Sequence, residues 1–146
     1  MSEEFTIFGR LAIYVVRDPV SWHGKISNNE QYLGDFTGPQ WESLFYKVLG
    51  CPIPNFGIPN EDVDEANNHY RIKFQNHLRQ YPMLGRIWDI YEGVNYLPKE
   101  VCRFRDECLE VRASTANPCA LDGLNILIQA CDKAKELGYG LVFESD

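Results

Sequence analysis

Apolar residues recur every three or four positions in several stretches of the chain, which is the spacing of one face of a helix. Prolines at the start of some stretches and glycines after others match the usual helix boundaries. The pattern predicts four to five helices, with the ranges 39–49, 62–81, 83–91, 98–111 and 117–137. The last range carries apolar side chains in several directions, so we expect it to be the most buried helix.

Two of these helices divide into an apolar and a polar side. The apolar stripe within 98–111 consists of Val101, Phe104, Cys108 and Val111. Glu107 falls on the polar side, so we expect it to face solvent. In the helix over 62–81, His77 lies on the apolar stripe between Phe74 and Tyr81. We therefore expect His77 to be a hydrogen-bonded core histidine.

Residues 5–16 are rich in β-branched and aromatic side chains, which favours either one strand or a bent pair of strands, with Gly9 at the bend. Glycine, asparagine and proline interrupt residues 17–38, which predicts a long loop holding a short hairpin around 25–36. Residues 139–144 are long enough for one closing strand, which we expect to pair with the first. The expected fold is α+β and helix-dominated, with a small sheet that includes the N- and C-terminal strands, in one globular domain over residues 1–146.

Composition narrows the classes of function. Acidic residues outnumber basic ones 21 to 14, giving a net charge of −7. Such a balance disfavours direct binding to nucleic acid or to an anionic membrane, and it permits attraction to a basic protein. No apolar run approaches the roughly 18 residues of a membrane span, and the Met-Ser-Glu-Glu start is acidic where a secretory signal would be basic. We expect a soluble, cytoplasmic protein.

The sequence contains no recognisable catalytic or metal-binding motif. Its five cysteines are scattered, with no CxxC pair and no histidine within four residues. Serine nucleophile elbows, phosphate-binding glycine loops and dinucleotide fingerprints are also absent. We therefore expect reduced thiols, with Cys108 and Cys131 buried, no metal, no cofactor and no enzymatic activity.

The densest charge feature is a group of four carboxylates at the start of the helix over 62–81: Glu61, Asp62, Asp64 and Glu65. Anions are favoured at a helix N-terminus, so a structural role suffices to explain them. Two functional interpretations remain open. The carboxylates could hold a divalent cation, or they could form an acidic docking patch for a basic partner.

Trp22 and His23 are the second candidate site, because they lie in the long loop, where functional residues often concentrate. Tryptophan is enriched at binding hot spots, which favours a partner-binding role for Trp22. The alternative is that the loop closes over a pocket in which His23 acts on a small ligand.

Three segments carry a resemblance to a known family. They are Tyr-Pro-Met-Leu-Gly-Arg-Ile-Trp-Asp-Ile-Tyr-Glu-Gly from residue 81, the run from Pro98 to Leu109, and the run from Leu121 to Asp146. Together they resemble the small immunity proteins of bacterial polymorphic toxin systems, in particular the family numbered seventy. The resemblance covers residues 81–146, and it implies a cytosolic, non-enzymatic protein that binds a cognate toxin and blocks its active site or substrate channel.

The leading hypothesis is therefore a stoichiometric toxin inhibitor. Many toxins of this kind are basic nucleases, and an acidic inhibitor can imitate the phosphate backbone that such a toxin binds. The competing hypothesis is a small enzyme or ligand-binding domain with a pocket near Trp22 and His23. A third is a subunit of a larger assembly, in which exposed aromatic residues form a permanent interface.

Overall fold

The computed structural model describes residues 9–27, 29–51 and 63–145, without the side chains of residues 63, 64, 66 and 67. The elements, in chain order, are β1 (Arg10–Val16), β2 (Gln31–Thr37), α1 (Gly38–Trp41), the π-helical segment η1 (Glu42–Val48), α2 (Val63–His77), the 3-10 turn η2 (Leu84–Ile87), β3 (Val94–Tyr96), α3 (Pro98–Ala113), α4 (Pro118–Leu137) and β4 (Gly140–Ser145). The fold is thus mixed α and β, as predicted.

The strands form one antiparallel sheet in the order β2-β1-β4-β3. The predicted pairing of the first strand with the last is confirmed, and this pair forms the centre of the sheet. The hairpin expected within 25–36 is wrong, because residues 31–37 pair with β1 instead. A shift in register between Ile13 and Tyr14 accompanies Gly34, whose φ of 141° suits only glycine well.

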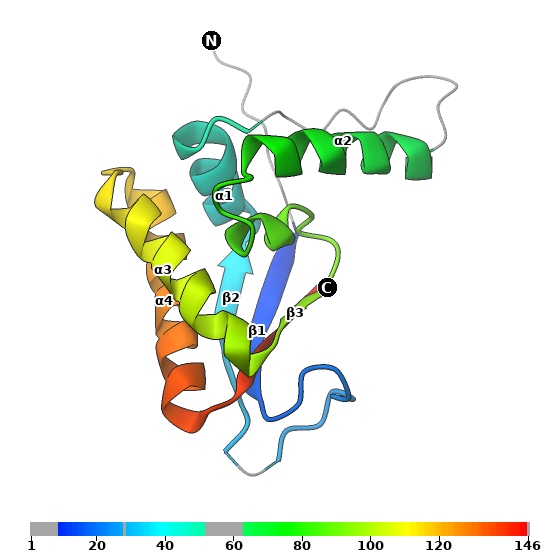
Figure 1. Ribbon diagram of the computed structural model, residues 1–146, viewed down its shortest axis with the longest axis vertical. Helices are drawn as coiled ribbons and strands as arrows, with labels where there is room; N and C mark the ends of the chain where they lie inside the picture. Colours follow the sequence, from blue (N-terminus) through cyan, green and yellow to red (C-terminus); the bar gives the residue numbers. More distant parts are fainter. Residues whose placement is uncertain (1–8, 28, 52–62, 146) are drawn as a thin grey trace.

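The helices α3 and α4 cover one face of the sheet, and α2 crosses one end of the molecule (Figure 1). Side chains alternate between the two faces of a strand, so Leu11, Ile13 and Val15 of β1 all point toward these helices and are fully buried. All the described elements contribute to one hydrophobic core. In that core Tyr96 stacks on Phe104 with ring centroids 4.1 Å apart.

The helix α4 follows its sequence signals closely. The side chain of Asn117 accepts a hydrogen bond from the N–H of Ala120 at 3.0 Å, Pro118 occupies the first turn, and Gly138 ends the helix at a φ of +70°. Its buried residues include Cys131, and Cys108 of α3 is also buried, as predicted.

Aromatic side chains attach α2 to the rest of the core. Phe74 stacks on Trp41 with centroids 6.1 Å apart and contacts Phe45 at 5.3 Å. Trp41 in turn donates a hydrogen bond from Nε1 to the carbonyl of Ile87 at 3.1 Å. The prediction for His77 is wrong: its side chain is exposed, and Nε2 lies 2.7 Å from the carbonyl oxygen of Leu49. His77 therefore makes the predicted hydrogen bond, but it makes this bond at the surface and not in the core.

The prediction for Glu107 is also wrong, because this residue of α3 is only 6% exposed. Its Oε1 accepts hydrogen bonds from the N–H groups of Met83 and Leu84, both at 2.9 Å. Its Oε2 lies 3.4 Å from Nε of Arg103. The backbone at the start of η2 therefore supplies the polar partners that allow a carboxylate to be buried.

Candidate functional site

Three aromatic rings gather on the face of the sheet opposite α3 and α4. Tyr14 of β1 is the central ring, with its centroid 4.9 Å from that of Trp22 and 5.5 Å from that of Tyr32 in β2. Tyr14 and Tyr32 are directly paired across the two strands, and Tyr32 is 48% exposed. We call Tyr14, Trp22 and Tyr32 the Tyr14 cluster.

The loop over residues 17–30, which presents Trp22, is held by its own hydrogen bonds. The carboxylate of Glu30 accepts from the N–H of Arg17 at 2.8 Å and from both the N–H and the hydroxyl of Ser27, at 3.1 and 3.0 Å. Trp22 donates from Nε1 to the carbonyl of Lys25 at 3.2 Å. These contacts join the two ends of the loop and connect Trp22 to Lys25, so the residues that make them need less ordering when a partner binds.

Pro19 anchors the same loop to the sheet. Its carbonyl accepts a hydrogen bond from Nδ2 of Asn95 in β3 at 3.0 Å. Its ring packs against Gly140 of β4, where an added Cβ would lie 2.4 Å from Pro19 Cγ and 2.4 Å from the carbonyl oxygen of Tyr96. Only glycine leaves room for this approach, so the position of the loop depends on Gly140.

The loop that presents Trp22 also carries exposed apolar side chains and carboxylates. Val20 and Ile26 of the loop are 73% and 51% exposed. A hydrogen bond from the Ser21 hydroxyl lowers the pKa of Asp18. Desolvation alone would raise the pKa of Glu30, but hydrogen bonds from Arg17 and Ser27 outweigh it and the pKa is lowered. Both carboxylates therefore stay ionised at neutral pH, beside an apolar surface.

A third carboxylate stands next to Tyr32. Asp35 accepts a hydrogen bond from the Tyr32 hydroxyl at 2.7 Å and forms an ion pair with Arg10 at 3.0 Å. The hydrogen bond to Asp35 raises the pKa of Tyr32. The ring of Tyr32 is thus fixed at its hydroxyl while its face stays accessible.

The candidates chosen from the sequence fall at two separate places. Trp22 belongs to the Tyr14 cluster, and His23 is exposed beside it. Glu65 is exposed on α2, at the opposite end of the molecule from the loop over 17–30 (Figure 1). Glu61 and Asp62 lie outside the described residues, as does the side chain of Asp64. The structure therefore does not join Glu65 to the Trp22 site.

Sequence reasoning missed Tyr14 and Tyr32 as members of the site. Tyr14 alternates with the buried Ile13 and Val15, and this alternation places it on the outer face once residues 10–16 are assigned as a strand. Tyr32 could not be placed in the same way, because its strand was expected as part of a separate hairpin.

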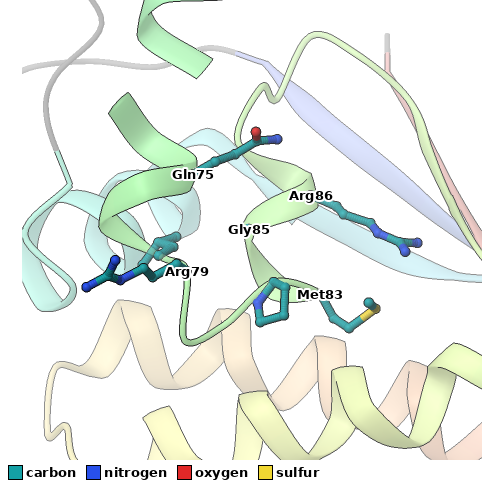
Figure 2. A pocket seen from close by; sticks show the side chains of 7 residues that line it. Gln75, Arg79, Met83, Gly85 and Arg86 are labelled. Atoms are coloured by element: carbon teal, nitrogen blue, oxygen red, sulfur yellow. The ribbon is translucent and has the colours of Figure 1, made fainter. Parts of the chain in front are cut away.

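A groove of about 450 Å³ lies elsewhere, between the end of α2 and η2 (Figure 2). Its lining residues are Gln75, Leu78, Arg79, Pro82, Met83, Gly85 and Arg86. Neither Trp22 nor His23 lines it. Among the described residues, no three histidine, cysteine, aspartate or glutamate side chains are grouped so that they could hold a metal ion.

No protein-family model, curated protein or solved structure matches the chain. Within the described residues, every helix is too short or too polar to span a bilayer.

Proposed function

We propose that this protein is a non-enzymatic, cytoplasmic immunity protein that binds and inhibits a cognate bacterial toxin through the Tyr14 cluster and the loop over 17–30. The observation that carries the proposal is a cluster of three aromatic rings on one face of the sheet, with Tyr32 48% exposed, in which Trp22 comes from a loop that its own hydrogen bonds hold. The toxin as partner comes from the family resemblance of residues 81–146.

The chemistry of this surface suits a protein partner. Tryptophan and tyrosine side chains bury a large area and lose few rotatable bonds on binding, and they dominate interface hot spots. An ordered loop lowers the entropy cost of association. The loop carries Arg17 and Lys25 against Asp18 and Glu30, so attraction to a basic partner rests on the net charge of −7 of the whole chain.

The test is a pulldown with the tagged protein as bait from the organism that encodes it, at low and moderate salt. We expect one stoichiometric, basic partner whose capture weakens as salt rises. Trp22→Ala should reduce affinity for that partner by about 2 kcal/mol or more, roughly thirtyfold in Kd. Tyr46→Ala is the matched control, because Tyr46 is exposed on η1 and outside the cluster.

Inhibition is then measured directly. Expression of the captured partner alone should arrest growth, and co-expression of the wild-type protein should restore it, whereas the Trp22→Ala variant restores it less. A partner that is harmless when expressed alone would contradict the immunity function. Equal affinity of the Trp22→Ala variant and the wild type would contradict the proposal that the partner binds through the Tyr14 cluster.

A further inference from the structure

Positive charge is concentrated in one stretch of an otherwise acidic chain. Residues 66–88 contain Arg71, Lys73, Arg79 and Arg86 and no aspartate or glutamate, although the whole chain has a net charge of −7. The groove between α2 and η2 is lined by residues 75–86 and is therefore built from this stretch alone. The residues that line the groove therefore include two arginines and no carboxylate, in contrast to the acidic chain as a whole.

The groove combines a cation with an apolar lining. Figure 2 shows Arg79 and Arg86 extending in opposite directions, with Gly85 between them and Met83 on the same side as Arg86. Arg86 is already neutralised by an ion pair with Glu100. Arg79 is exposed and has no ion-pair partner among the residues that the structure describes. The unneutralised charge at the groove is therefore that of Arg79.

The apolar lining comes from Leu78, Pro82 and Met83. Gly85 has no side chain to fill the groove, and an added Cβ there would lie 3.7 Å from Leu78 Cβ. Methionine is an adaptable contact residue, because its unbranched side chain has several rotatable bonds. This lining suits a bulky apolar side chain lying next to a negative charge.

Hydrogen bonds with α3 and β3 hold the η2 side of the groove in place. Glu107 accepts hydrogen bonds from the N–H groups of Met83 and Leu84, and the hydroxyl of Tyr96 donates to the carbonyl of Met83 at 2.6 Å. Arg86 is held by Glu100 and by the carbonyl of Asn95 at 3.2 Å. The groove is therefore a preformed feature, which reduces the entropy cost of binding.

We propose that this groove is a docking site for an acidic segment of a partner protein, in which a carboxylate beside a bulky apolar side chain binds Arg79 while the apolar side chain enters between Leu78 and Met83. A phosphate backbone would use the charge but not the apolar lining, and the net charge of the whole chain opposes nucleic acid. The site lies outside the loop over 17–30 and does not depend on the function proposed for that loop.

The proposal is tested with a short fluorescein-labelled peptide of alternating leucine and glutamate, titrated with the full chain and followed by fluorescence anisotropy. We expect saturable binding that weakens as salt rises. Arg79→Glu should weaken it about tenfold or more, because charge reversal replaces attraction with repulsion. Met83→Ser should also weaken it through loss of apolar contact.

Lys135→Glu is the matched control, because Lys135 is exposed on α4 and this substitution changes the net charge by the same amount as Arg79→Glu. It should leave the affinity within about twofold. A peptide with glutamine in place of glutamate, and a single-stranded oligothymidine, complete the set. The proposal is overturned by no saturable binding up to about 1 mM, by equal effects of the Arg79 and Lys135 changes, or by tighter binding of the neutral peptide or the oligonucleotide.

Discussion

Glu107 caps the start of η2 from a different helix: its Oε1 accepts a hydrogen bond from the N–H of Leu84, 23 residues earlier in the chain, at 2.9 Å. The N–H groups at the start of a helical turn have no partner within that turn, and a buried carboxylate can satisfy them. Together with the Met83 N–H, which binds the same oxygen, and the ion pair between Arg86 and Glu100, this contact connects α3 to the segment that forms one side of the groove.

Removal of that carboxylate is expected to be costly. Glu107→Ala leaves the N–H groups of Met83 and Leu84 without their acceptor in a buried position, so we expect a loss of about 2–4 kcal/mol in the free energy of unfolding. Urea unfolding followed by circular dichroism measures this loss. Glu110→Ala is the control, because Glu110 is exposed on the same helix. Similar midpoints for the two variants would show that the cap contributes little.

Glu107 also predicts a pH dependence of stability. Burial raises its pKa above 4.5, although the N–H groups of Leu84 and Met83 and the charge of Arg103 offset part of that effect. The folded state therefore binds the proton more tightly than the unfolded state, so this group's contribution to stability falls as the pH rises through the interval above 4.5.

The measurement is the free energy of unfolding across this interval for the wild type and for Glu107→Gln, which keeps an acceptor and does not titrate. The wild-type value minus the variant value should decrease with rising pH. A constant difference would mean that Glu107 has the same pKa in both states, and an increasing one would mean that its pKa is lowered on folding.

Gly140→Ala is predicted to disturb both the fold and the loop over 17–30. The new methyl group would overlap Pro19 Cγ and the carbonyl of Tyr96, and overpacking of this kind costs about 1–3 kcal/mol. Because Pro19 anchors the loop, affinity for the partner should fall as well. Gly85→Ala is the control, since its Cβ would meet Leu78 Cβ at an ordinary 3.7 Å. Thermal unfolding and titration with the partner, carried out on both variants, test whether the close approach of Pro19 to Gly140 contributes to stability and to affinity.

The acidic group at the start of α2 has its own prediction. Charge reversal to lysine at all four positions, Glu61, Asp62, Asp64 and Glu65, should weaken binding of a basic partner, reduce its salt dependence and leave the fold intact. Titration of the captured partner at two ionic strengths tests this, with circular dichroism to check folding. Unchanged affinity would show that the acidic group is not part of the interface. Its role would then be the stabilisation of the helix N-terminus.

The two long C-terminal helices were predictable because their signals are local, whereas the helix predicted over 83–91 is wrong, since only the 3-10 turn over Leu84–Ile87 forms there, and α2 ends at His77 before the predicted 81. The Asn117 cap and the Gly138 end of α4 act within one turn, and the α3 stripe repeats at helical spacing. Long-range contacts explain the failures. Three residues are too few for β3 to show alternation, and Val94 and Tyr96 become a strand only by pairing with Phe143 and Leu141.

The candidate site was predictable only in part, for the same reason. Trp22 was identified from its residue type and its place in a loop, whereas Tyr14 and Tyr32 join it through pairing across two strands. The burial of Glu107 depends on N–H groups more than 20 positions away, which no helical pattern encodes.

Because β4 lies between β1 and β3, the sheet cannot be completed until the end of the described chain has been synthesised. Once β1, β2 and β3 have been synthesised, β3 still lacks β4, its neighbour in the described sheet, and β1 still lacks one of its two neighbours. The apolar side of the growing sheet therefore stays open until Gly140–Ser145 emerges and inserts between β1 and β3. Pairing across so many residues is slow compared with helix formation, so the chain completes its fold after translation of β4, and α3 and α4 form ahead of the sheet that they cover.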